Sequence, residues 1–246
     1  MNDKVYIHEL IDIIGPHRAE YMHHMTANWS PTAREERHQL CYGVWGVVGS
    51  TGRWPAVLNI WEEDGFAGLA SSFAAELGHP TLQDPKLAEW WAEAANFRRG
   101  GEDRLLVPAP WSRTIDQLCA DGVRGAVYAH ETFSVSPGGA TDFLENVADA
   151  AVAVYDQFGW VLAGAWHTAL GDESECIVLW AIPTWGQWAE LEQAAVRDTP
   201  LRQWRRALDR RVVAARRFLV VDAPLCPFRT GRQPLKSDRT DDWRTF

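Results

Sequence analysis

Apolar and polar residues alternate along two segments that are nearly identical, VYIHELIDIIGP from Val5 and VYAHETFSVSPG from Val127. Alternation with a period of two is typical of a β-strand whose two faces meet different surroundings. Each segment ends at a Gly/Pro pair, which stops a strand and lets a helix begin. The pattern therefore predicts two equivalent strands, one at the start of the chain and one near its middle.

The agreement between the two halves continues beyond these strands. GVW at 43–45 corresponds to GAW at 164–166, and each is followed by a turn and an apolar strand, AVLNIW or ECIVLW. Further on, DPKLAEWWAEA resembles DTPLRQWRRAL, and RLLVPAP resembles FLVVDAP. Such an ordered series predicts a tandem repeat, each unit running strand, helix, strand, strand, helix, helix, strand. The predicted boundaries are 1–113 and 122–225, with a short linker and a polar tail, 226–246, that wraps the surface or is disordered.

This βαββαβ order is that of a ferredoxin-like α+β unit. The opening strand with its Gly/Pro stop, the Gly-x-Trp strand and the apolar strand after a turn resemble the dimeric α+β barrel superfamily. The L-x-x-W helices, with Leu87 and Trp90 in one half and Leu201 and Trp204 in the other, are most similar to the NIPSNAP family. The resemblance implies that two ferredoxin-like repeats close one barrel within the chain, as a pseudo-dimer. Proteins of the superfamily include cofactor-free monooxygenases, isomerases, cyclases, haem proteins and binding proteins, and a homodimer is typical.

Charge and composition narrow the class of partner. The formal net charge of −9 argues against nucleic acid, because phosphate binding needs a basic surface. The polar start predicts no export signal, and no apolar run reaches the roughly 18 residues of a membrane span. The four cysteines have no C-x-x-C spacing, so we expect reduced thiols in a cytoplasmic protein. The fourteen tryptophans indicate a large aromatic core or pocket.

Strand alternation selects the candidate catalytic residues. In the first strand an aliphatic face, interrupted by Glu9, suits a layer of helices. The opposite face carries Tyr6 and His8, and its counterpart carries Tyr128 and His130. We expect these four side chains in the barrel interior, either as hydrogen-bonded core residues or as acid–base groups, since the pKa of histidine is near neutral.

Four further residues are candidates for substrate binding: Trp45, Trp166, Tyr21 and His24. Trp166 and His167 lie on opposite faces of one strand, so only one of them can be internal. His17, Tyr21 and His24 share a helix face, but without a carboxylate at ligand spacing we predict no metal.

A basic segment follows in the second half. RQWRRALDRRVVAARR predicts a helix with seven arginines, which either form a solvated face or bind an anion such as a carboxylate or a CoA phosphate. The arginines are Arg202, Arg205, Arg206, Arg210, Arg211, Arg216 and Arg217.

Three functions stay open at this level. The first is a cofactor-independent isomerase, cyclase or monooxygenase that binds a small apolar or weakly anionic molecule and uses histidine and tyrosine. It requires neither nucleotide nor metal, since glycine-rich phosphate loops and a G-x-S-x-G motif do not occur in the sequence. The second is a non-catalytic ligand-binding or interaction protein, and the third is a haem protein with an interior histidine as axial ligand.

Overall fold

The computed structural model describes residues 1–197, 199–208 and 212–240. Its strands form one closed barrel in the order β1-β3-β2-β8-β5-β7-β6-β4, with every neighbouring pair antiparallel. The strands are β1 (Val5–Ile13), β2 (Leu40–Val47), β3 (Ala56–Glu63), β4 (Arg98–Pro108), β5 (Val127–Val135), β6 (Val161–Ala169), β7 (Glu175–Ile182) and β8 (Val212–Asp222).

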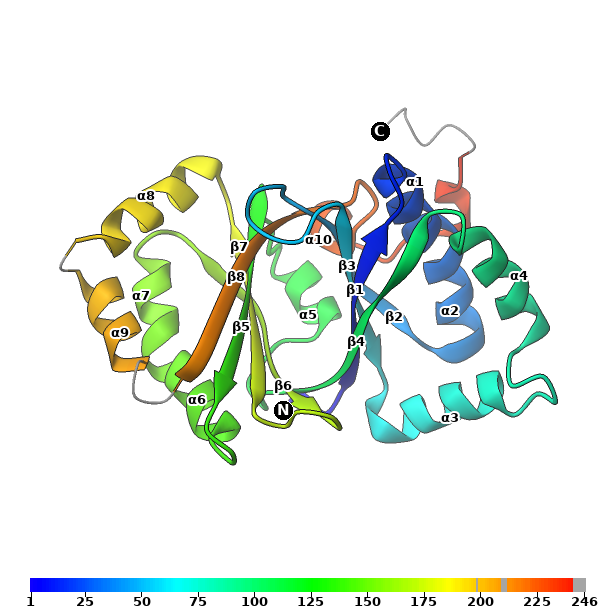
Figure 1. Cartoon of the computed structure of the whole chain (residues 1–246), viewed down its shortest axis with the longest axis horizontal. Helices are drawn as coiled ribbons and strands as arrows, with labels where there is room; N and C mark the ends of the chain where they lie inside the picture. The colour runs from blue at the N-terminus through cyan, green and yellow to red at the C-terminus, as the bar shows by residue number, and fades with distance from the viewer. Residues whose placement is uncertain (198, 209–211, 241–246) are drawn as a thin grey trace.

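The helices lie outside the barrel, one group beside each half (Figure 1). Beside β1–β4 are α1 (Arg18–His23), η1 (His24–Trp29), α2 (Ser30–Arg37), α3 (Gly65–Leu77) and α4 (Pro85–Ala94). Beside β5–β8 are α6 (Ala140–Asn146), η2 (Val147–Ala151), α7 (Val152–Asp156), α8 (Trp185–Ala195) and α9 (Pro200–Leu208). Between them are α5 (Ile115–Ala120), α10 (Pro227–Thr230) and the short η3 (Lys236–Asp238).

Each half has the strand order of a ferredoxin-like unit, β4-β1-β3-β2 in the first and β8-β5-β7-β6 in the second. The predicted fold class, two such repeats closing a pseudo-dimeric barrel within one chain, is confirmed. The repeat boundaries at 113 and 122 stay a prediction.

The two halves join through short pairings that leave part of a strand unpaired. β2 pairs with β8 only over Trp45–Val47, and β4 pairs with β6 only over Leu105–Pro108. Residues 98–104 of β4 and 212–218 of β8 therefore each have one free edge. The two free edges are equivalent by the pseudo-symmetry of the barrel, and both border a cavity described below.

The Gly-x-Trp motif is explained by the barrel interior. The indole of Trp45 lies over Gly43 of the same strand, and a Cβ atom on Gly43 would be 2.0 Å from the ring. In β6, a Cβ atom on Gly164 would be 1.9 Å from the ring of Trp166. Both tryptophans are fully buried. Glycine is required at these positions because the ring occupies the space of its missing side chain.

We expect Gly43→Ala and Gly164→Ala each to lower the free energy of unfolding by about 1–3 kcal/mol, the usual cost of overpacking a core. Chemical denaturation measures the change. Gly186→Ala is a suitable control, because the nearest atom to its new Cβ is 3.7 Å away and alanine favours the helix. Equal stability of all three variants would contradict this explanation of the motif.

Three segments differ from the sequence prediction. The predicted linker folds into α5, which Thr114 and Gln117 begin with a capping box. The tail is neither on the surface nor disordered at its start, because Phe228 is buried against Trp45 and Tyr128. This ring adds to the apolar filling of the barrel.

The prediction that the arginine-rich helix extends over 202–217 is wrong. Helix α9 ends at Leu208, and β8 begins at Val212, where two successive valines favour a strand. Arg216 and Arg217 are therefore strand residues, whereas Arg210 and Arg211 lie outside the described residues.

Within the described residues, none of the helices combines the length and the apolar character needed to cross a bilayer. The four cysteines are free thiols, with Cys41, Cys176 and Cys226 buried and Cys119 half-buried.

Candidate functional site

His8 and His130 meet at the centre of the barrel. Their Nε2 atoms are 2.9 Å apart, and the two rings are 1% and 2% exposed. Burial lowers the pKa of both imidazoles, to about 3 for His130, and the positive charge of Arg104 lowers them further. At neutral pH both rings are therefore uncharged, with one Nε2–H donating to the other Nε2. Both Nδ1 atoms are buried and have no partner in the described part of the chain.

Tyr6 and Tyr128 also point into the barrel, as the strand alternation predicted. The hydroxyl of Tyr6 donates to Glu62 Oε2 at 2.9 Å, and that of Tyr128 donates to Asp222 Oδ2 at 3.4 Å. Each also accepts a hydrogen bond, from the Asn2 amide and the backbone N–H of Gly125 respectively. Burial is the main reason that the pKa of each tyrosine is raised. Both hydroxyls are thus occupied by hydrogen bonds within the protein.

Aromatic side chains surround these groups. Tyr6 packs edge-to-face on Tyr42 and Trp166, and Phe218 stacks on His130 with centroids 4.5 Å apart. Neither histidine lines any of the four cavities described below. A haem needs open space beside its axial ligand, so the residues around His8 and His130 do not fit that group. Acid–base catalysis by these histidines and tyrosines stays a prediction.

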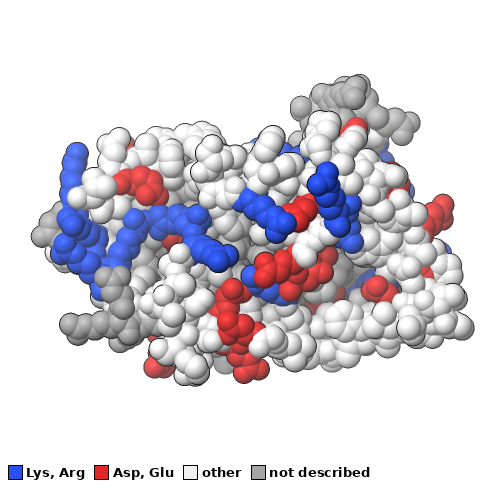
Figure 2. Space-filling view, in the orientation of Figure 1, with Lys and Arg blue, Asp and Glu red and all other residues white. Residues whose placement is uncertain are grey.

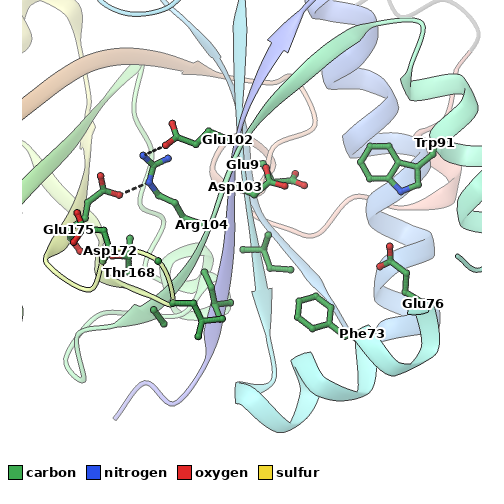
Figure 3. Close-up of a pocket in the computed structure, with 15 residues that line it drawn as sticks. Glu9, Phe73, Glu76, Trp91, Glu102, Asp103, Arg104, Thr168, Asp172 and Glu175 are labelled. Atoms are coloured by element: carbon green, nitrogen blue, oxygen red, sulfur yellow. Dashed lines mark hydrogen bonds and ion pairs between the residues drawn. The ribbon is translucent and has the colours of Figure 1, made fainter. Parts of the chain in front are cut away.

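The largest of these four cavities, about 730 Å³, lies between the first repeat and the β6–β7 hairpin of the second (Figure 3). It wraps the free edge of β4 and is bordered by α3 and α4. Its apolar walls include Ile7, Phe73, Trp91 and Leu105. A narrower cavity of about 90 Å³ shares several of these residues and extends to Trp61. The volume is within the range of small-molecule sites.

Glu9 is one of the charged residues that line this cavity. Its Oε2 accepts hydrogen bonds from Trp61 Nε1 at 2.9 Å and Asn59 Nδ2 at 3.0 Å. Oε1 accepts none from the described residues. The carboxyl group is therefore held in place by one oxygen while the other is available to a ligand.

Asp103 lies directly opposite Glu9 on the neighbouring strand, and both side chains point towards α3 and α4 in Figure 3. Burial raises the pKa of Glu9, the negative charge of Asp103 adds to the rise, and the bonds from Trp61 and Asn59 oppose it. Burial likewise raises the pKa of Asp103, against the opposing charge of Arg98. A carboxyl group with a raised pKa is suited to exchange protons near neutral pH.

Glu131 is the residue of the second repeat that corresponds to Glu9, and its hydrogen bonds differ from those of Glu9. Glu131 faces Arg217 across the strands, and the guanidinium Nε donates to Glu131 Oε1 at 2.7 Å. Trp180 Nε1 donates to Oε2 at 2.8 Å, and Tyr155 OH donates to Oε1 at 3.2 Å. Both oxygens of Glu131 are therefore bonded within the protein. Only the first repeat leaves this carboxylate available.

The four predicted substrate-binding residues are not brought together. Trp45 and Trp166 fill the barrel, with Trp166 internal and His167 on the other face. Tyr21 is the buried residue of α1, and its hydroxyl accepts a hydrogen bond from Asn59. His24 stacks on Trp90 at the edge of a separate surface cavity of about 360 Å³. Their role in binding stays a prediction.

Sequence reasoning missed Glu9, Asp103 and Trp91 as site residues. One signal was present, because Glu9 interrupts an otherwise aliphatic strand face. Residues of α3 and β4 line the cavity only because of tertiary packing, and no local sequence pattern indicated that they would. Among the described residues, no group of three or more His, Cys, Asp or Glu side chains is arranged to hold a metal ion.

Comparison with solved structures identifies the class. An anthrone oxidase-like protein is similar over 90% of this chain and 94% of its own, with 15% identity and a TM-score of 0.61. A provisionally named monooxygenase from Lactobacillus acidophilus is similar over 96% and 97%, with 9% identity and a TM-score of 0.58. These identities are low and show the fold alone. The chain has the fold of the dimeric α+β barrel superfamily.

Residues 128–227, which span most of the second repeat and less than half of the chain, match the NIPSNAP family model. No curated protein is similar enough to the chain to count as a match.

Proposed function

We propose that the cavity beside β4 is a cofactor-independent enzyme site that removes a proton from a small, largely apolar molecule, with Glu9 as the acid–base group. The observation that carries the proposal is a carboxylate that lines a cavity beside apolar side chains, with one oxygen bonded within the protein and the other free of described partners. The general base must lie within hydrogen-bond reach of the proton it takes. Glu9 lines the cavity that would hold the substrate, whereas no cavity among those described reaches His8 or His130.

The charge of the cavity restricts the substrate. Acidic side chains line it around a single basic one, Arg104, which is already paired with Glu102 and Glu175. This lining repels an anion, so the substrate is neutral or cationic. The walls of Phe73 and Trp91 favour an aromatic ring. An enolisable aromatic ketone combines both properties and carries an acidic C–H bond.

Anthrone is the first probe, a choice supported by the structurally similar protein named anthrone oxidase-like. In D2O without oxygen, Glu9 would accept a methylene proton, giving the enolate, and a deuteron would return to carbon. We expect the protein to accelerate this exchange and Glu9→Gln to slow it at least about 100-fold, the usual contribution of a general base. Proton NMR measures the exchange directly.

Two variants make the assay specific. Glu190→Gln removes an exposed carboxylate of α8, remote from the lining of the cavity, and should exchange anthrone at the wild-type rate. The double variant His8→Leu/His130→Leu should retain exchange if Glu9 is the base. Loss of exchange in the folded histidine variant, with Glu9→Gln active, would assign the chemistry to the barrel interior instead.

A non-catalytic binding protein is the second candidate. The exposed ring of Phe73 and the open rim of the cavity favour ligand exchange with solvent. Tight binding of anthrone without any isotope exchange would support this function over the enzyme.

A further inference from the structure

The second repeat has its own cavity at the equivalent place, with the opposite charge. It encloses about 580 Å³ beside the free edge of β8 and is bordered by α9. Its apolar lining includes Phe133, Trp204, Leu208 and Val212. Figure 2 shows basic side chains gathered over this half of the molecule and acidic ones over the centre.

The reversal of charge follows from strand positions that correspond by register. Glu102 and Asp103 on the edge of β4 are replaced by Arg216 and Arg217 on the edge of β8. Arg205 of α9 adds a third guanidinium to the cavity. Of these three, Arg217 is bonded to Glu131 and Glu192. Arg205 interacts with Tyr155, so its Nη2 and the guanidinium of Arg216 are the donors left for a ligand.

Arg205 and Arg216 both have unused donors. The Nη2 atom of Arg205 is buried and has no hydrogen-bond partner in the described part of the chain. The side chain of Arg216 is exposed and forms neither a hydrogen bond nor an ion pair with any described residue. A buried guanidinium donor without a partner is costly, and both arginines line the same cavity.

We propose that this cavity binds a small organic monocarboxylate, with its carboxylate between Arg205 and Arg216 and its apolar body on Trp204 and Leu208. Guanidinium groups bind carboxylates through paired, charge-assisted hydrogen bonds. A monoanion fits better than a phosphate dianion, because Glu131 and Glu192 also line the cavity and repel a second negative charge. The site is distinct from the Glu9 cavity and does not depend on the function proposed there.

Octanoate is the probe, and isothermal titration calorimetry on the full chain measures its affinity. Octanamide, which has the same chain and no charge, should bind at least about tenfold more weakly, as should inorganic phosphate. Arg216→Gln and Arg205→Gln should each weaken octanoate binding at least about tenfold, since each removes charge-assisted hydrogen bonds. Arg202→Gln, on the same helix but outside the lining, should stay within about twofold of wild type.

Each result either supports or overturns the proposed carboxylate site. Octanoate binding that is lost in both cavity variants and kept in Arg202→Gln supports the site, provided that all variants keep the unfolding midpoint of the wild type. Equal affinity for octanoate and octanamide would overturn it, as would wild-type affinity in Arg216→Gln. No binding at millimolar octanoate would also overturn it and leave the arginines with the role of charges that protect a free strand edge from pairing. Anthrone exchange at Glu9 is measured separately, so either proposal can fail alone.

Discussion

Replacing Arg217 by Met is expected to lower the free energy of unfolding by about 3–5 kcal/mol, the usual cost of leaving a buried carboxylate without its partner. Glu131 is 2% exposed and would lose its charged partner while keeping its bonds to Trp180 and Tyr155. Chemical denaturation near neutral pH measures the effect. The double variant Arg217→Met/Glu131→Gln should recover part of the loss, because the unpaired charge is then removed.

The corresponding variant of the first repeat is a matched control. Asp103→Met changes the residue opposite Glu9, which is the position equivalent to Arg217. Here the change removes a like charge whose presence raises the pKa of Glu9, so stability should be unchanged or slightly higher. A loss of several kcal/mol in Asp103→Met, with little loss in Arg217→Met, would refute this interpretation, in which Arg217 neutralises the buried charge of Glu131 whereas Glu9 has no basic residue at the equivalent position.

Much of the fold could be predicted because the two halves repeat the same local signals. The alternation in the segments that start at Val5 and Val127, the Gly-x-Trp strands and the turns were sufficient to predict the order of elements along each repeat and the inward direction of His8 and His130. The boundary between α9 and β8 was missed because arginines are compatible with both helix and strand. Only the pairing of β8 with β5 decides that Arg216 lies in a strand.

The candidate sites were harder to predict, because both depend on which strand edge stays free. The sequence contains no local sign that β4 meets β6 over only its last residues, or that Glu9 and Asp103 become neighbours. The two halves share their strand and turn patterns, whereas the candidate ligand-binding residues lie at positions where the halves differ. Asp103 and Arg217 can be recognised as equivalent positions only once the strand register is known.

Acidification is expected to destabilise the protein through the histidine pair at the centre of the barrel. Burial lowers the pKa of His8 and His130 in the folded state, whereas an unfolded histidine titrates near pH 6.5. The contribution of the pair is therefore constant above about pH 6.5. Below that pH the unfolded chain binds protons first, and stability falls by about 1.4 kcal/mol per pH unit for each histidine.

Between pH 6.5 and 5 the pair thus accounts for a loss of about 4 kcal/mol. The charge of Arg104 acts on both rings; it stays protonated throughout and disfavours their protonation. Urea denaturation of wild type and His8→Leu/His130→Leu at pH 7.5, 6 and 5 tests this, since the difference between the curves cancels all other titrating groups. Stability of the double variant should fall less steeply with acid, and parallel curves would show that the pair is protonated as readily in the folded state as in the unfolded chain.

The single variants separate the pairing of the two rings from their burial. In His8→Leu the Nε2 of His130 loses its partner at 2.9 Å, and a buried polar atom without a partner costs about 1–3 kcal/mol. Each single variant should therefore be less stable than the double variant at pH 7.5, because two apolar side chains can pack together without unsatisfied polar atoms. Single variants more stable than the double would mean that the imidazoles contribute by filling space and that their mutual hydrogen bond is unimportant.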